Sequence, residues 1–402
     1  MLLRLTDGTT TIKLHDNSSA ATVGIYGARY VPTESDNDTV TETADIVFGG
    51  DQGVVLSIAS DVKRILKIAE NPDAPTVYIE YREIDSGDVY RSPVQSGRLV
   101  WSSDPALRHF AQSTPTIEAA LIITRNNYWE GPEETIGNTT IRNGTTSPYN
   151  AISLTQIEGS LPTPVKVRMT NPNGVDMDTR NLYLAVDAFA GLTSNAHLYA
   201  GTSGSWGSAT THSTLLHILT LSATAITALA GKAIHVLGAF STVSTGIYMR
   251  ASLYSLFESV YESVNHGPEK YTTGEKLVDL GVLEVPKVVT GGLVLVITVQ
   301  SDSAGTANLT FAQVAPAKGA VKLSMGYEWD ASDIVTYDGP EDTAYYETGG
   351  AKHAIVRKIG GPLMVWPDRT NRLHILFDEG TDFTASRQTN VTVTARPRRA
   401  TI

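Results

Sequence analysis

The feature that most constrains the fold is a boundary in the first third of the chain. An apolar segment at residues 117–125 runs directly into the sequence NNYWEG at residues 126–131, and a polar tract rich in Gly, Asn, Thr and Pro follows. An extended run that stops at an aromatic pair and a glycine is typical of a strand that closes a compact domain. We therefore expect a domain at residues 1–131, a linker at residues 132–150 and a different unit beyond it.

Length and composition favour several β-rich domains. A chain of 402 residues with 41% hydrophobic residues can bury two or three cores. Charged residues make up only 18% and there are 34 glycines, a balance that favours strands joined by turns over helical bundles. The net charge of -11 argues against a surface that coats nucleic acid, because phosphate binding needs clustered Lys and Arg.

Several further classes are excluded or disfavoured. The chain has no cysteine, which rules out disulfides, thiolate catalysis and cysteine-ligated zinc. Its first eight residues, MLLRLTDG, become polar too soon for a signal peptide. No apolar run approaches the roughly 18 residues that a membrane-spanning helix needs. We expect neither a membrane nor nucleic acid as a partner.

One amphipathic helix is predicted within residues 1–131. Apolar residues recur with helical spacing from residue 51 to residue 70, and the prolines at positions 72 and 75 end the pattern. Strands before and after one helix indicate an antiparallel sheet packed on it. The predicted strands are a hairpin at residues 2–14 and segments 23–30, 40–48, 77–81, 89–94, 97–101 and 117–125.

The remainder of the chain predicts a β-sandwich, most simply a jelly roll, at residues 151–324. Short apolar segments alternate there with Gly and Pro turns. Residues 214–229 fit a helix and two strands equally well. Residues 325–402 form too small a piece to stand alone, so we expect them to complete one of the earlier sheets. The predicted strands are 152–157, 165–170, 181–189, 233–238, 247–254, 278–285, 293–299, 309–314 and 390–395.

Three groups of segments together resemble tail components of tailed bacteriophages. They are YRSPVQSGR at 90–98 with RNNYWEG at 125–131, then IEGSLPTP at 157–164, and WPDRTNR at 366–372 with RPR at 396–398. Their order is similar to that of a distal tail (baseplate hub) protein, in which a ring-forming β domain carries a galectin-like or jelly-roll domain. The chain departs from that pattern in its long middle sandwich.

The resemblance carries implications for assembly and location. It implies a virion protein of the tail, made in the host cytoplasm, that forms a hexameric or trimeric ring with itself and binds other tail proteins. Ring assembly needs exposed strand edges, which the N-terminal hairpin and the strand at residues 40–48 can supply.

No catalytic or metal-binding constellation stands out. Among nine histidines only His212 and His217 lie close together, and their spacing of five fits no HExxH-type site. The pair Ser203 and Ser205 lies in a glycine-rich stretch without the G-x-S-x-G spacing of a nucleophile elbow. We expect no catalytic residue, no metal site and no cofactor.

Two carboxylate patterns also have plain structural interpretations. Oxygen-bearing residues alternate in NPNGVDMD at residues 171–178, but the bidentate glutamate that closes an EF-hand is missing, so a polar turn is favoured over a calcium loop with Asp176 and Asp178. Glu133 and Glu134 are adjacent in the predicted linker, where solvation explains them better than glycosidase chemistry does.

Two functions therefore stay open. The first is an oligomeric structural protein of a phage tail, without enzymatic activity. The second is a glycan-binding module that attaches a tail or fibre to the host surface, with Trp206, Tyr254 and Tyr261 as the aromatic contact residues.

Overall fold

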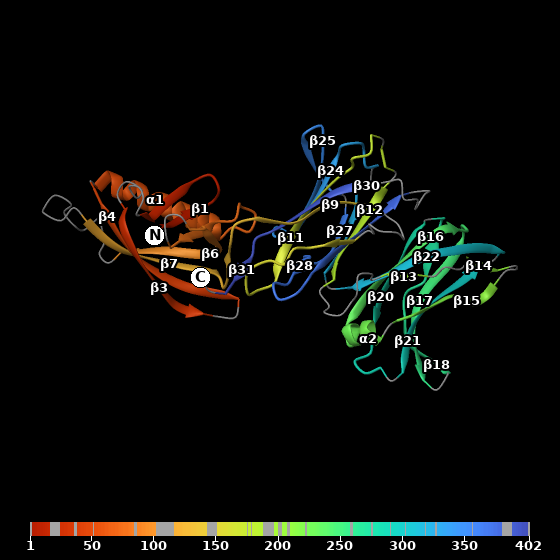
Figure 1. The fold of residues 1–402 in the computed structure, drawn as a ribbon. Coiled ribbons are helices and arrows are strands. Elements are labelled where there is room, and N and C mark those ends of the chain that lie inside the picture. Colours follow the sequence, from red (N-terminus) through yellow and green to blue (C-terminus); the bar gives the residue numbers. More distant parts are fainter. Residues whose placement is uncertain are drawn as a thin grey trace. The chain divides into compact units, whose positions relative to one another are not determined.

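The computed structural model is mainly β and divides into two compact units (Figure 1). It describes residues 2–16, 25–35, 38–50, 52–83, 87–101, 116–142, 151–174, 176–177, 179–187, 197–199, 203–206, 210–221, 223–257, 260–274, 276–289, 291–301, 303–317, 319–325, 328–355, 357–379 and 388–400. The N-terminal unit comprises residues 1–133, 158–161 and 396–402, and the second unit comprises residues 134–157 and 162–395. The expected mainly β fold, with an N-terminal antiparallel domain that contains one helix and a β-sandwich after it, is confirmed.

The N-terminal unit is built on one antiparallel sheet with the order β2-β1-β5-β6-β7-β4-β3. The strand predicted to close the domain is β7, which lies inside this sheet between β6 and β4. The strand predicted at residues 40–48 is β4, which is also interior, so β2 and β3 are the edges instead. The bounds are β1 (Leu2–Thr6), β2 (Thr11–Asp16), β3 (Ile25–Ser35), β4 (Thr39–Gly49), β5 (Tyr78–Arg82), β6 (Tyr90–Trp101) and β7 (Thr116–Asn126).

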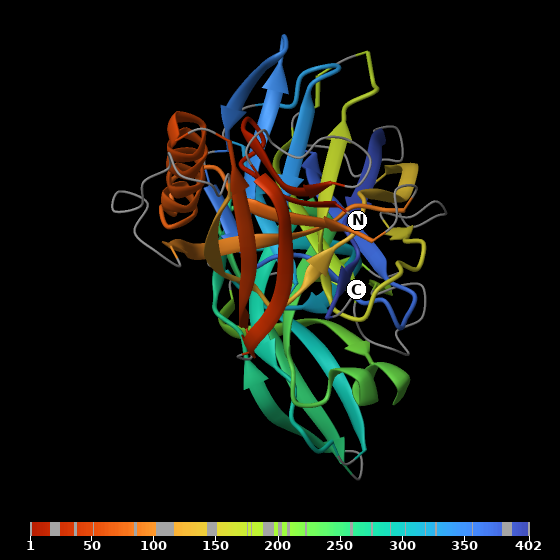
Figure 2. The ribbon, with the colours of Figure 1, turned by 90° about the vertical axis from the view of Figure 1, so that its left-hand side faces the viewer.

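The predicted helix is α1 (Gln52–Ala69), which lies against the sheet (Figure 2). Its buried side chains Val62, Ile65 and Leu66 join the core formed by the sheet, whereas Leu56 is 46% exposed on the opposite face. Leu66 lies so close to β6 that a Cβ at Gly97 would be 2.7 Å from its methyl carbon. No helix within the described ranges is both long and apolar enough to cross a membrane.

Two later segments return to the N-terminal unit. Strand β8 (Trp129–Glu130) pairs with β31 (Arg398–Arg399), and β8 also pairs with β6. Leu161 forms an isolated bridge with Arg398. The prediction that everything beyond residue 131 forms a different unit is therefore wrong, because the C-terminal segment completes the first one.

The second unit contains a sandwich of two antiparallel sheets around one large core. Their orders are β26-β25-β24-β11-β30-β9, with β28 also paired to β11, and β10-β29-β12-β23-β27. The segment predicted as a linker differs from that prediction, since residues 134–142 form strand β9. The bounds are β9 (Glu134–Arg142), β10 (Ala151–Ser153), β11 (Thr163–Thr170), β12 (Thr179–Asp187), β23 (Ala320–Ser324), β24 (Ile334–Asp338), β25 (Thr343–Thr348), β26 (Ala351–Ala354), β27 (Arg357–Gly360), β28 (Met364–Val365), β29 (Arg372–Glu379) and β30 (Gln388–Ala395).

A second sandwich lies between β12 and β23 in the sequence, and it has jelly-roll order. Its first strand is split into β13 and β14 and its fifth into β18 and β19; counted along the chain, the sheets read 1-8-3-6 and 2-7-4-5. The jelly roll thus covers residues 197–316, and the other sandwich frames it. The bounds are β13 (His197–Tyr199), β14 (Ser203–Trp206), β15 (Thr210–Thr220), β16 (Ala233–Val243), β17 (Ile247–Phe257), β18 (Val260–His266), β19 (Lys270–Thr272), β20 (Leu277–Glu284), β21 (Gly292–Ser301) and β22 (Gly305–Pro316).

The ambiguous segment at residues 214–229 contains both kinds of structure. Its first part belongs to β15, and its last part is the short helix α2 (Ala223–Leu229). Leu221 lies between them and is buried with Leu229 in the jelly-roll core. Because a strand is followed by a short helix, neither the helical nor the alternating spacing of apolar residues describes residues 214–229 as a whole.

The jelly roll is inserted where a hairpin turn would stand. Ala185 on β12 lies opposite Ala320 on β23, and Val186 N donates to Gly319 O at 3.1 Å, so the two strands form an antiparallel pair up to the insertion. Outward side chains of β12 and β29 meet outward side chains of the jelly roll in a small apolar cluster. This cluster consists of Tyr183, Leu237, Ala239, Leu277 and Leu376.

Candidate binding surfaces

The three aromatic residues predicted to contact a glycan do not form one group. Tyr254 on β17 is half-buried, and its ring lies 5.9 Å from the His266 ring in an edge-on arrangement. Tyr261 belongs to β18 in the same sheet, whereas Trp206 ends β14 in the opposite sheet of the jelly roll. The side chains of Trp206 and Tyr261 lie outside the described residues.

A different aromatic pair is exposed on the jelly roll. Tyr248 on β17 and Tyr271 on β19 lie opposite each other, with exposed fractions of 45% and 56%. Their ring centroids are 5.1 Å apart and their planes are inclined by 58°. Tyr248 stands between the buried residues Ile247 and Met249. The alternation along β17 was thus a signal for an outward Tyr248, but only the pairing with β19 identifies Tyr271.

Polar groups lie on the same outer face as this pair. Arg250 alternates with Tyr248 on β17, and its Nη2 donates to Glu269 Oε1 at 2.6 Å. Farther along, His266 Nδ1 lies 2.9 Å from Oγ of Ser252, which is itself buried. Aromatic rings beside hydrogen-bonding side chains suit a ligand that has both apolar faces and hydroxyl groups.

The oxygen-rich loop at residues 171–178 is organised as a turn. Asn171 is fully buried, and its Nδ2 donates to the carbonyl oxygens of Trp329 and Asp330 at 2.9 and 3.1 Å. Asp176 Oδ1 accepts from Ala331 N at 2.9 Å. Asp178 lies outside the described residues. These bonds use the Asn171 amide nitrogen and an Asp176 carboxylate oxygen to join the loop between β11 and β12 to the segment before β24.

The other chemical candidates are placed apart. Ser203 and Ser205 lie within strand β14, so they are not on a strand-to-helix elbow. Glu133 forms an ion pair with Arg396 at 3.6 Å, while Glu134 begins β9. His212 and His217 belong to β15, but their side chains are outside the described residues. Within the described ranges, no three His, Asp or Glu side chains are grouped as metal ligands would be.

Several segments that carry the sequence resemblance converge in the N-terminal unit, in a region we call the C-terminal seam (residues 90–91, 128–131, 158–161 and 396–399). Glu130 pairs with Arg91 at 3.2 Å and with Arg398 at 2.9 Å. The Arg398 guanidinium lies 4.0 Å from the centroid of the Tyr128 ring. Gly159 has φ of 122°, and a Cβ there would be 2.6 Å from the Arg398 carbonyl oxygen. Glycine is therefore required where these segments cross.

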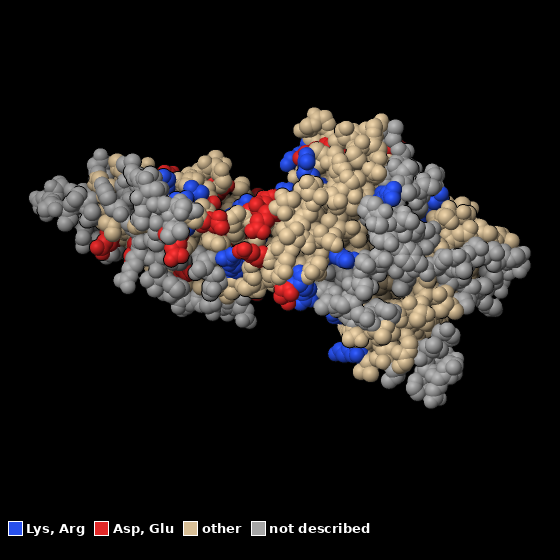
Figure 3. Space-filling view, in the orientation of Figure 1, with Lys and Arg blue, Asp and Glu red and all other residues tan. Residues whose placement is uncertain are grey.

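The described charges differ between the two units on the face seen in Figure 3. Acidic and basic side chains are interspersed on the N-terminal unit, whereas on the second unit the described atoms seen in this view are mostly tan, with fewer blue and red groups.

No protein-family model and no curated protein matches this chain. Among solved structures, it is similar to phage SPP1 Dit (gp 19.1), described as a paradigm of the hub adsorption apparatus in Gram-positive infecting phages; identity is 9%, 99% of each chain is covered and the TM-score is 0.33. It is also similar to the activated phage P2 baseplate with Ca, at 7% identity, with 98% of this chain and 97% of that chain covered and a TM-score of 0.28.

A third similar structure is infectious bursal disease virus, Gx strain. The identity is 10%, 92% of this chain and 81% of that chain are covered, and the TM-score is 0.20. Both phage matches cover nearly the whole of this chain, at low TM-scores.

Proposed function

We propose that this protein is a structural component of a phage tail, at the distal tail or baseplate, and that it acts as an oligomeric scaffold. The observation that carries the proposal is the nesting of its β domains. The first sandwich is inserted into the N-terminal unit, and the jelly roll is inserted into a hairpin of that sandwich. Each insertion leaves the domain before it intact.

Nesting suits a scaffold because one unit can anchor while another is displayed. The N-terminal unit holds both the first strands and the C-terminal strand β31, which the C-terminal seam fixes through Glu130 and Arg398. Its edge strands β2 and β3 offer backbone groups to a neighbouring chain. A symmetric ring is the usual solution for such edges, and a ring with hexameric or trimeric symmetry agrees with the sequence resemblance.

Sedimentation velocity of the full chain tests the proposal. We expect a discrete species whose mass is a small multiple of 43.1 kDa and whose population rises with protein concentration. Phage particles made without this chain should have incomplete tails. A monomer at high concentration, together with complete tails in such particles, would overturn the scaffold assignment.

Glycan binding is a second candidate, favoured by the exposed pair Tyr248 and Tyr271. The double variant Tyr248→Ala/Tyr271→Ala should lose adsorption to host cells or to purified cell-wall polysaccharide while its unfolding is unchanged. Ile359→Ala, which truncates an exposed apolar side chain on β27, is the matched control. Equal adsorption by both variants would exclude a role for this face.

A further inference from the structure

The turn between β28 and β29 holds an exposed tryptophan in a fixed position. Asn371, only 1% exposed, donates from Nδ2 to the carbonyl oxygens of Trp366 and Arg369 at 2.8 and 3.0 Å, and its Oδ1 accepts from Trp366 N at 2.9 Å. Gln156 Nε2 donates to Pro367 O at 2.7 Å. The indole of Trp366 nevertheless remains 36% exposed. A buried asparagine thus preorganises a side chain that the fold itself only partly covers.

Basic groups gather at this turn, and we call the set Lys232, Lys287, Trp366 and Arg369 the basic end. The Arg369 guanidinium lies 5.0 Å from the Trp366 ring centroid and pairs with Asp368. Burial and then the nearby Arg369 charge lower the pKa of Lys232. A Cβ at Gly231 would lie 2.9 Å from Lys287 Cγ, which places Lys287 beside Lys232. Tryptophan with arginine is the composition most enriched where protein partners bind tightly.

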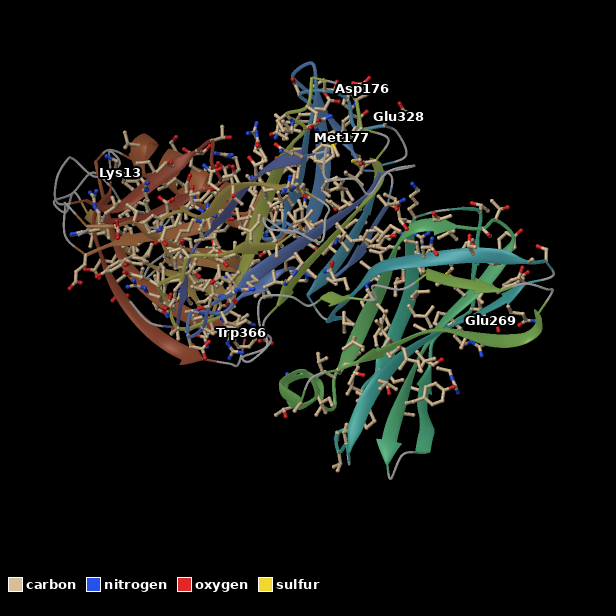
Figure 4. The ribbon with its side chains drawn as sticks, turned by 45° about the vertical axis from the view of Figure 1, so that its right-hand side comes forward. Lys13, Asp176, Met177, Glu269, Glu328 and Trp366 are labelled. Carbon is tan, nitrogen blue, oxygen red and sulfur yellow. The ribbon has the colours of Figure 1, made fainter. Side chains whose placement is uncertain are left out.

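The opposite end of the same sandwich is acidic. Strand β11 begins where Thr163 pairs with Val365, next to Trp366, and finishes where Thr170 pairs with Ile334. These ends are about 23 Å apart along the strand. Figure 4 shows Asp176 and Glu328 together, far from Trp366. We call Asp176, Glu328, Asp330 and the buried Asp333 the acidic end, because the charges of Asp330 and Asp176 act on Asp333 and Figure 4 shows Asp176 beside Glu328.

The carboxylates of the acidic end repel one another. Burial, and after it the charges of Asp330 and Asp176, raise the pKa of Asp333. Thr348 and His353 act in the opposite direction on the same carboxyl group. A cation brought to this end would therefore relieve repulsion that the isolated chain retains.

We propose that the basic end of one copy binds the acidic end of the next copy, which makes a head-to-tail contact between sandwiches. This inference rests on the proposed oligomeric scaffold and names one of its interfaces. Because the two surfaces differ and share no residue, the contact is heterologous, and repeating it closes a ring when the rotation permits. Complementary charge fixes the orientation of the copies, and the tryptophan supplies the apolar anchor.

Charge reversal tests the pairing directly. The basic-end variant is Lys232→Glu/Arg369→Glu, and the acidic-end variant is Glu328→Lys/Asp330→Lys. Each alone should raise the dissociation constant for self-association, measured by sedimentation velocity of the full chain, more than tenfold. An equimolar mixture of the two variants should regain assembly, since each then supplies the charge that the other lacks. Trp366→Ala should weaken assembly to a similar extent.

Two control variants accompany these measurements. Lys67→Glu reverses a charge whose side chain is 81% exposed on α1, and Ile359→Ala truncates an apolar side chain that is 45% exposed. Both should assemble like the wild type, and all variants should keep the wild-type unfolding transition. If the charge-reversed variants assemble as strongly as the wild type, the proposed contact is wrong, but the proposed scaffold function is not affected. Failure of the mixture to form any species that contains both variants would also overturn the contact. A wild-type chain that stays monomeric would overturn the contact, and it would overturn the scaffold as well if particles without the chain have complete tails.

Discussion

Arg125 on β7 binds Glu42 on β4 through two hydrogen bonds of 2.6 Å, from Nε to Oε2 and from Nη2 to Oε1. Their side chains are only 6% and 3% exposed. The guanidinium also lies 4.2 Å from the Trp129 ring centroid, and its Nη1 donates to the Asn126 carbonyl oxygen at 2.8 Å. One buried ion pair thus connects the interior of the N-terminal sheet to the segment that leads into the second unit's sequence.

Glu42→Ala should destabilise the N-terminal unit by about 3–5 kcal/mol, because it leaves the buried charge of Arg125 without its carboxylate. Urea unfolding of the full chain measures the change. The control is Lys67→Ala, which removes the exposed pair of Lys67 with Glu70 and should leave the transition where it is. Equal effects of the two substitutions would show that the buried pair is not structural.

Ile65→Asp should unfold the N-terminal unit. Ile65 is fully buried on the face of α1 that packs against the sheet, and an unpaired carboxylate there costs about 3 kcal/mol or more. Leu56→Asp on the exposed face of the same helix should change the free energy of unfolding by no more than about 0.5 kcal/mol. Both variants place an aspartate in α1, so the difference between their melting temperatures reports the effect of burial and not that of helix propensity. Similar melting temperatures would contradict the assigned packing.

Stability should also fall in strong acid through Asp279. Burial raises the pKa of this carboxyl, but the hydrogen bond and charge of His235, the Gly281 N–H and the charge of Lys322 together lower it to about 2. The folded pKa is below the unfolded one, so the contribution is complete above about pH 4 and is lost as the pH falls through 2. It amounts to about 2 kcal/mol.

NMR titration of the Asp279 carboxyl checks this expectation. His235→Ala removes the partner whose Nε2 lies 2.8 Å from Asp279 Oδ1, and the pKa of Asp279 should rise towards its usual value of 3.8. The stability difference between wild type and Asp279→Asn should shrink between pH 4 and pH 2. A difference that stays constant over this interval would contradict the assigned shift.

Excision of the jelly roll should leave its host sandwich folded. Replacing residues 187–318 by Asn-Gly supplies a two-residue turn between Val186 and Gly319, next to the paired residues Ala185 on β12 and Ala320 on β23. Leu376→Ser is included because the excision uncovers that side chain, which is otherwise fully buried. Circular dichroism and unfolding should show one transition fewer than the wild type. Loss of all cooperative unfolding would mean that the host sandwich cannot fold without the jelly roll.

Local elements could be predicted from the sequence where one spacing of apolar residues, helical or alternating, dominates a segment. The helix at residues 51–70 was predicted from its apolar spacing, and α1 matches it within one residue at each end. Strand β6 was predicted as two pieces, residues 89–94 and 97–101, whereas the structure has one strand that continues through Gly97. That glycine instead serves the close approach of Leu66, a constraint that only the packed helix reveals.

Long-range pairing was not readable in the same way. The β12 and β23 segments are both ordinary apolar strands, and no local pattern records that Ala185 faces Ala320 across an entire domain. Similarly, Glu42 occupies a buried position in an alternating strand, and its partner Arg125 lies 83 residues away. For the candidate surface, the alternation around Tyr248 was a usable signal, whereas the partnership with Tyr271 depends on sheet register.

The insertion point between β12 and β23 has a consequence for how such a protein can change over time. The two ends of the jelly roll connect to β12 and β23 at the point where these strands are still hydrogen-bonded to each other. Any folded domain whose own termini lie close together can occupy that position without altering a single pairing of the frame. A lineage can therefore exchange the displayed domain by recombination at two short sites, keeping its assembly parts while it acquires a new surface.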